Sequence, residues 1–367
     1  MNLNKLKNVA LGLALSTIIF ACETDSVEKA DMPSQSVEIL PLRKGPQKSG
    51  ILSKKTSEPS LTVPENLGSL FKKEAVEPTD CGPTKFVAVQ NYYLNQLVSD
   101  PYWDYGAYST YSDLSLYIAY FDTDEQYFGA NGEYTHLVNK RKRELERFWD
   151  MSGQVRVNGQ HTATLNDRDK VAFGYQLFGF PEDIAYQAAD QVLAYNALSE
   201  QFPENPFFAL DGFATPSQLI VLGDGLIRML SETGIDTDIV YTGVLAHEWA
   251  HQVQFLNGDE WYPEGADPDP VADTRYTELE ADFMAAYFMT HKRGATYNWK
   301  RVEEFFTLFF RIGDCGFDND GHHGTPLQRI AAAQLGYNLA ASVQKQGHIL
   351  SQQEAHEYFV SHVQSIL

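Results

Sequence analysis

The chain has 367 residues, of which 43% are hydrophobic and 13% aromatic, so it can bury one large core or two modest ones and is not disordered as a whole. Its formal net charge of −21 repels phosphate backbones, so we expect no nucleic acid as a partner. Three cysteines are too few for a disulfide scaffold, and Cys81 and Cys315 are either a pair or two separate buried thiols.

The first residues have the pattern of a secretory signal. Lys5 and Lys7 precede an apolar run, residues 9–20, that is too short to span a bilayer. The run ends in IFAC at Cys22, which resembles the lipobox of bacterial lipoproteins. This resemblance implies that residues 1–21 are removed as a signal peptide and that Cys22 carries a lipid anchor. We therefore expect the protein in the bacterial cell envelope, outside the cytoplasm, at the outer membrane or cell surface rather than the inner membrane. The alternatives are a plain secreted protein and an uncleaved anchor.

A tether is expected to separate this anchor from the folded part. Residues 22–85 hold seven of the 16 prolines and too little apolar surface to offset the entropy of ordering. The alternative is a pro-segment that covers the active site. The folded domain is predicted over residues 86–367, with an aromatic N-terminal part, 86–210, and a core, 211–345, that carries the motifs described below.

Most of the domain is predicted to be helical, which places it in the α+β class with a small sheet. Residues 86–135 show only weak periodicity and give no assignment. The turn dipeptide Asn158-Gly159 favours a hairpin across residues 154–162. Helices are predicted over residues 139–149, 166–178 and 181–202, and a strand over 217–222 is followed by a helix that ends near Leu230.

Residues 244–255 read VLAHEWAHQVQF and contain an HExxH motif. Because His247 and His251 are four residues apart, a helix places both imidazoles on one face, one turn apart. That spacing suits two ligands of one Zn²⁺, while Glu248 can reach a water on the metal rather than the metal itself. Gly258 is expected to end this helix. The alternative is an ordinary helix with two partly exposed histidines.

The third ligand distinguishes between two kinds of zinc site. The pattern HExxHxxGxxH is excluded, because Gln254 and Asn257 stand where it needs glycine and histidine. Another kind takes a glutamate from a second helix, and residues 274–294 have a helical pattern with Glu278 and Asp282 four apart. We expect Glu278 to be the third ligand and Asp282 to accept a hydrogen bond from a ligand histidine.

Three protein ligands leave one zinc position open, which is typical of a catalytic rather than a structural site. Zinc lowers the pKa of its water to about 7, and Glu248 is expected to take the proton as general base. Glu280 points away from Glu278 along a helix, so it is rejected as a ligand and expected to face solvent. These residues predict a zinc-dependent peptidase with one catalytic ion.

Three blocks in this order resemble a neutral zinc metallopeptidase family of the gluzincin type, whose pattern is HExxHxVQ, ELxAD and HG[ST]xxQR. They are HEWAHQVQ at 247–254, ELEAD at 278–282 and HGTPLQR at 323–329. The resemblance implies a zincin-like domain with the ligands and base assigned above. The strand 217–222 before the HExxH helix also resembles the CAAX-prenyl-protease and heat-shock membrane peptidase group. There such a strand lies along the cleft and can pair with substrate.

The third block has two interpretations. His323 either reaches the cleft, where it would stabilise an oxyanion as a catalytic residue, or packs elsewhere. Arg329 is expected to be structural. Residues 325–328 and 351–354 each have the pattern of a helix capping box. Surface positions are expected for the remaining histidines, at 136, 161, 291, 348, 356 and 362.

The sequence therefore predicts a lipid-anchored zinc endopeptidase that acts on protein or peptide substrates outside the cytoplasm. One alternative is a catalytically silent lipoprotein that keeps zinc for stability and binds an envelope component through its aromatic half. Another is an amidase of cell-wall peptide. Retention of Glu248 favours a peptidase over the silent alternative, because a structural zinc site needs no base.

Overall fold

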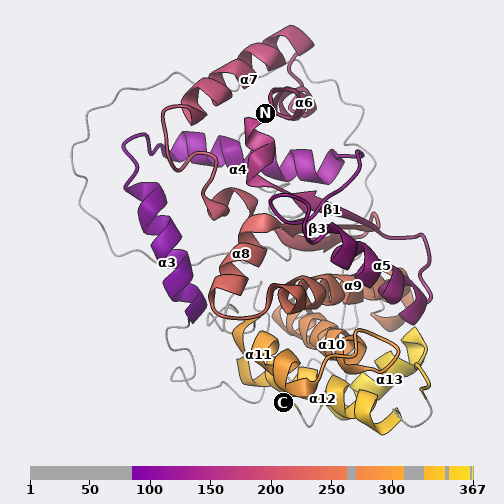
Figure 1. Ribbon diagram of the computed structural model, residues 1–367. Helices are drawn as coiled ribbons and strands as arrows, with labels where there is room; N and C mark the ends of the chain where they lie inside the picture. The colour runs from indigo at the N-terminus through magenta and orange to yellow at the C-terminus, as the bar shows by residue number, and fades with distance from the viewer. Residues whose placement is uncertain (1–84, 263–269, 310–325, 344–346, 364–365, 367) are drawn as a thin grey trace.

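Helices dominate the computed structural model, which describes residues 85–262, 270–309, 326–343, 347–363 and 366 (Figure 1). Within those residues there are eleven α-helices and one mixed three-stranded sheet, so the predicted α+β class is confirmed. The elements are α3 (Lys85–Val98), α4 (Tyr105–Phe121), α5 (Thr135–Phe148), β1 (Arg156–Gln160), η2 (Thr162–Asn166), α6 (Arg168–Leu177), α7 (Glu182–Asn196), η3 (Pro206–Ala209), β2 (Gly212–Thr215), β3 (Leu219–Gly223), α8 (Asp224–Glu232), α9 (Thr237–Trp261), α10 (Pro270–Thr290), α11 (Trp299–Phe309), α12 (Pro326–Val343) and α13 (Gln352–His362).

Local capping explains where several helices begin. Asp236 caps α9 by accepting a hydrogen bond from the Asp238 N–H, and Ser351 and Glu354 form the predicted capping box of α13. The prediction that Gly258 ends the HExxH helix is wrong, because α9 continues to Trp261. The Trp261 side chain is buried and its Nε1 donates to Gln353 Oε1 over 2.5 Å, so packing against α13 extends the helix past the glycine.

The predicted hairpin at Asn158-Gly159 is also wrong, since both residues lie within β1, which runs parallel to β3. The Asn158 side chain is buried and donates to the Ala119 carbonyl over 2.7 Å and to the Asp122 carbonyl over 2.9 Å. A side chain at Gly159 would lie 2.7 Å from the Tyr127 carbonyl oxygen. Close packing against the segment after α4 therefore selects this dipeptide, not a turn.

The sheet has the order β1-β3-β2, with β2 antiparallel to β3. The strand predicted over 217–222 is β3, and it pairs on both sides along its length. The expectation that this strand can pair with substrate is therefore wrong, because a middle strand has no free edge. The strand next to the long helix α9 is β2, and Gln252 of α9 donates to the carbonyls of Thr215 and Leu219.

Two large groups and one small group of buried apolar side chains organise the described part of the chain. One joins α4, α6, α7 and η3, and the larger one joins α9, α10, α12 and α13 with α5 and α8. Figure 1 shows α9 and α10 side by side below the sheet, with α11, α12 and α13 beyond them. In the described part of the chain, each helix is too short or too polar to cross a membrane.

Three of the histidines expected at the surface are buried. His161, His291 and His356 are 5%, 0% and 7% exposed, respectively, so the surface prediction is wrong for them. Each has a polar partner that offsets its burial: Asp224, the His348 carbonyl and Glu280. The exposed histidines agree with the prediction; they are at positions 136, 348 and 362.

Candidate metal centre

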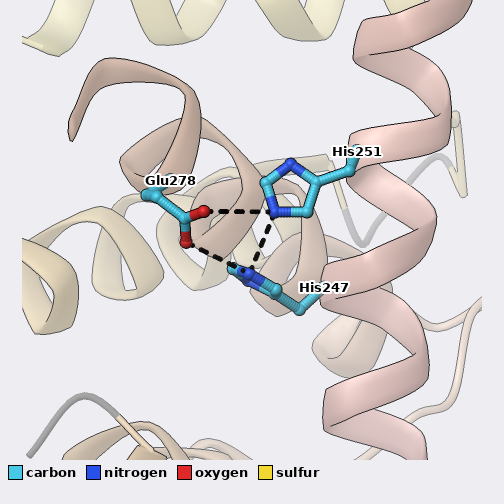
Figure 2. Close-up of side chains that lie close together, drawn as sticks. All are labelled: His247, His251 and Glu278. Carbon is cyan, nitrogen blue, oxygen red and sulfur yellow. Dashed lines mark hydrogen bonds and ion pairs between the residues drawn. The ribbon is translucent and has the colours of Figure 1, made fainter. Parts of the chain in front are cut away.

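The two histidines of HExxH and one glutamate converge between α9 and α10 (Figure 2). The Nε2 atoms of His247 and His251 lie 3.2 Å apart. Glu278 spans them, with Oε2 3.3 Å from His247 Nε2 and Oε1 3.4 Å from His251 Nε2. All three side chains are buried. The structure therefore brings together a His/His/Glu group that could hold a metal ion.

The donor set fits zinc. Ligands at about 2.0–2.1 Å from a tetrahedral ion lie roughly 3.3 Å from one another. The 3.2 Å between the two Nε2 atoms matches that spacing. One oxygen of Glu278 lies 3.3 Å from the first Nε2 and the other oxygen 3.4 Å from the second, and one ligand atom from each of the three residues lies within 4.8 Å of the others. Two imidazoles and one carboxylate are also a ligand set that zinc uses in catalytic sites, where a fourth position stays open.

Asp282 stands behind His247, one turn after Glu278 on α10. Its Oδ1 lies 3.0 Å from His247 Nδ1, on the side of the ring away from the group. A carboxylate there favours a proton on Nδ1 and leaves Nε2 free for a metal. Asp282 is completely buried, and the guanidinium of Arg329 on α12 contacts it through Nε at 2.7 Å and Nη2 at 2.9 Å.

Arg329 is itself buried and also reaches Glu278 Oε2, 3.4 Å from its Nη2. Burial lowers the pKa of this guanidinium, but Asp282 and Glu278 outweigh that effect and hold the pKa above its usual value. Arg329, which is expected from the sequence to be structural, thus contacts the candidate ligand Glu278. It also supplies positive charge to two buried carboxylates, those of Glu278 and Asp282.

His251 has a different support. Its Nδ1 lies 2.8 Å from Oε1 of Gln254, which follows it by three residues on α9. The Gln254 amide nitrogen donates to the Thr277 carbonyl over 2.8 Å and to Glu280 Oε2 over 3.2 Å. The Nδ1 atom of His251 therefore contacts a neutral amide, whereas that of His247 contacts a carboxylate.

The electrostatics of the group favour bound positive charge. Burial lowers the pKa of His247, but hydrogen bonding to Asp282 and Glu278 outweighs it and raises the pKa to about 10. For His251 too, the charge of Glu278 outweighs burial, so its pKa is raised. A site that holds protons this firmly attracts cations, and a metal must displace those protons to bind.

Glu248 is buried, 3% exposed, and adjacent to His247 on α9. Its role as general base stays a prediction. His323, Cys22, Cys81 and Cys315 lie outside the described residues, as do the signal segment and all of the tether except Lys85, with which α3 begins.

Glu280 does not face solvent, contrary to the sequence interpretation. It is 0% exposed and accepts from Gln254, His356 and Tyr262. The spacing did place it away from the candidate ligands, but residues 276–290 of α10 are buried on every side, so no position there faces solvent. The sequence analysis also missed Gln254, although its i,i+3 spacing from His251 indicates a shared face.

Comparison with models of protein families, with curated proteins and with solved structures finds no match for this chain. The buried His/His/Glu group is therefore the feature of the described residues that points to a function.

Proposed function

We propose that this protein is a zinc-dependent peptidase that hydrolyses peptide bonds of extracytoplasmic proteins. The observation that carries the proposal is the buried group His247, His251 and Glu278, which has the geometry of a zinc site and Glu248 beside it. A purely structural zinc site commonly has four protein ligands and needs no base, whereas three ligands with an adjacent carboxylate suit hydrolysis.

When bound, Zn²⁺ would supply a Lewis acid that acidifies water and polarises the scissile carbonyl. Glu248 would take the proton from the attacking water and deliver it to the leaving amine. Asp282 would hold the ring of His247, and Gln254 that of His251, so that both Nε2 atoms point to the same place. Burial of these groups would exclude competing water and strengthen their electrostatic effects.

An extended peptide could reach this centre along the outer edge of β2. In an antiparallel pair, every second residue directs its N–H and C=O toward the neighbouring strand. Asp211 accepts a hydrogen bond from the Gly223 N–H, so it faces β3, and the N–H and C=O of Ala214, three residues later, point away from β3. Gln252, next to His251, binds the end of this strand and fixes it against α9. Strand addition at β2 would therefore present a substrate backbone beside the metal-binding helix.

We also propose that the enzyme acts at the cell envelope, held by a lipid on Cys22 through the tether 22–85. The lipobox-like sequence at Cys22 and the proline-rich composition after it support this location. Substrates would then be proteins or peptides that the tethered domain can reach.

Replacement of Glu248 by Gln tests the activity. We expect the variant to keep one zinc per chain, because the ligands are unchanged, and to cleave unfolded protein at least about 100-fold more slowly. Metal analysis and a cleavage profile of a mixed peptide library measure the two effects. Glu260→Gln, an exposed position on the same helix, is the matched control and should cleave like the wild type.

Two outcomes would contradict the proposal. Cleavage by the Glu248→Gln variant at close to the wild-type rate would remove the assigned base. Zinc-loaded wild type that cleaves no peptide would instead favour the silent lipoprotein that binds an envelope component.

A further inference from the structure

A chain of buried polar contacts runs from the candidate metal centre to the C-terminal helix. It begins at His251 Nδ1, passes through the amide of Gln254 to Glu280 Oε2, and leaves from Glu280 Oε1 to His356 Nδ1 over 2.7 Å. The last residue belongs to α13, and 76 positions separate it from Glu280. The proposed reaction uses neither Glu280 nor His356, yet both are almost completely buried.

The chemistry of these groups fixes the direction of each hydrogen bond. The Thr277 carbonyl oxygen can only accept, so the NH₂ end of the Gln254 amide must face it and the neighbouring Glu280 Oε2. The oxygen of Gln254 then necessarily faces His251, whose Nδ1 must donate to it. A proton on Nδ1 leaves the Nε2 lone pair directed at the His/His/Glu group, as a ligand requires.

The Glu280 carboxyl group is held in place by partners on several elements. It is 0% exposed, and an isolated buried carboxylate is costly. His356 Nδ1 lies 2.7 Å from Glu280 Oε1, and its ring stacks on Trp261 with the ring centroids 4.2 Å apart and an angle of 5° between the planes. The Tyr262 hydroxyl donates to the same carboxylate.

The start of α13 is fastened to the end of the metal-binding helix. Asn257 donates to Gln352 Oε1 over 2.7 Å, and Trp261 donates to Gln353 Oε1 over 2.5 Å. These contacts hold α13 where His356 meets Glu280. Two consecutive turns of α13 therefore make these contacts: Gln352 and Gln353 bind the end of α9, and His356 binds Glu280.

We propose that Glu280, held by His356 of α13, is a positioning residue that acts through Gln254 to fix the tautomer and orientation of His251. This inference rests on the proposed metal centre but not on peptidase activity. It makes α13 a functional part of the centre, because this helix supplies the His356 ring that holds Glu280 in place.

We call the chain of contacts from His251 through Gln254 and Glu280 to His356 the relay. Zinc affinity, measured by competition with a chelating indicator, tests it. Gln254→Met removes the acceptor for His251 and should lower zinc affinity by about 10- to 100-fold. His356→Phe keeps an aromatic ring against Trp261 but loses the donor, and we expect up to about a tenfold loss. His356→Asn places an amide N–H near the position of Nδ1 and should restore affinity to within about twofold of the wild type.

A double variant separates a relay from general loosening of the fold. If His356 acts through Gln254, adding His356→Phe to Gln254→Met should lower zinc affinity no further, whereas independent effects would multiply. The melting temperature of each zinc-free protein is measured alongside. His356→Leu tests the same point if the Phe variant does not fold, and His362→Asn, an exposed α13 position, is the control.

The outcomes are distinct. Zinc binding by His356→Phe within about twofold of the wild type, or losses that multiply in the double variant, would overturn the relay. Wild type that holds no zinc would overturn the metal centre and the relay together. Wild type that holds zinc but cleaves nothing would overturn the peptidase proposal alone, because the relay is read from affinity.

Discussion

Arg329 is the strongest single test of how the buried charges of this centre are balanced. Glu248, Glu278 and Asp282 are three buried acidic side chains, and Arg329 is the buried guanidinium that contacts two of them. Replacement of Arg329 by Met keeps much of the side-chain volume but leaves Asp282 and Glu278 without this counter-charge. In zinc-free protein we expect the variant to be strongly destabilised.

The size of the effect follows from burial. Removing one partner of a buried ion pair typically costs about 3–5 kcal/mol, because the remaining charge stays desolvated. Arg329 is 4% exposed and makes two contacts of 2.7 and 2.9 Å to Asp282. Since His247, whose pKa is raised to about 10, stays beside both carboxylates as a second positive group, we expect the lower end of that range, about 3 kcal/mol. For a domain of this size the loss corresponds to a fall in melting temperature on the order of 10 °C.

Equilibrium unfolding in urea of the zinc-free protein measures this loss. Arg301→Met is the matched control, because Arg301 pairs with Asp236 at 3.0 Å where both side chains are about half exposed. An exposed pair of that kind contributes at most about 1 kcal/mol. The double variant Arg329→Met/Asp282→Asn should be more stable than Arg329→Met alone, since it removes one of the two buried negative charges that have lost the guanidinium.

A loss below about 1 kcal/mol for Arg329→Met would refute the reasoning, because the carboxylates would then be stable without their counter-charge. A double variant less stable than Arg329→Met would also contradict it. It would show that Asp282 contributes through packing or hydrogen bonds rather than through paired charge.

Two further predictions concern the fold that carries the site. Burial raises the pKa of Asp211 to about 6, so its stabilising contribution is complete below pH 3.8 and is lost as the pH rises through 6. Asp211→Asn should therefore stabilise the protein at pH 8 by about 1–2 kcal/mol, a figure reduced because the side chain is partly exposed. At pH 4 the substitution should have little effect. Equal effects on thermal unfolding at both pH values would contradict this prediction. A Cβ at Gly336 of α12 would lie 2.1 Å from the Phe283 carbonyl oxygen of α10. Gly336→Ala should push the two helices apart, cost about 1–3 kcal/mol and weaken zinc binding by displacing Arg329; unchanged zinc affinity would show that Arg329 does not depend on this contact.

The sequence predicts the three candidate ligands of this site because the spacing that brings them together is mostly local. Two histidines four residues apart on a helix share a face whatever surrounds them, and a carboxylate ligand on a second helix needs only one long-range contact. The structure places His247, His251 and Glu278 together, as that reasoning expects. Periodicity likewise identified α5, α6, α7 and α9, although their ends differ by several residues.

Residues whose environment comes from distant segments were misjudged. Asn158-Gly159 has the composition of a turn but is a buried part of β1, because α4 and the segment after it pack against it. The sequence predicts a surface position for His356, because nothing near it in the sequence indicates the carboxylate that it meets. Glu280 was assigned to solvent because helical spacing tells which way a side chain points, not what lies in that direction.

The residues that support the two candidate histidine ligands share one feature. Two carboxylates, Asp282 and Glu280, lie completely buried on α10 behind the candidate ligands. Each meets a basic group supplied by a later helix, Arg329 of α12 for Asp282 and His356 of α13 for Glu280. Since a buried carboxylate needs polar partners, each support is complete only when its own helix has packed. The ligands lie on α9 and α10, but their orientation depends on the last two helices of the chain. Loss of α13 should therefore affect His251 and leave the Asp282 support of His247 in place.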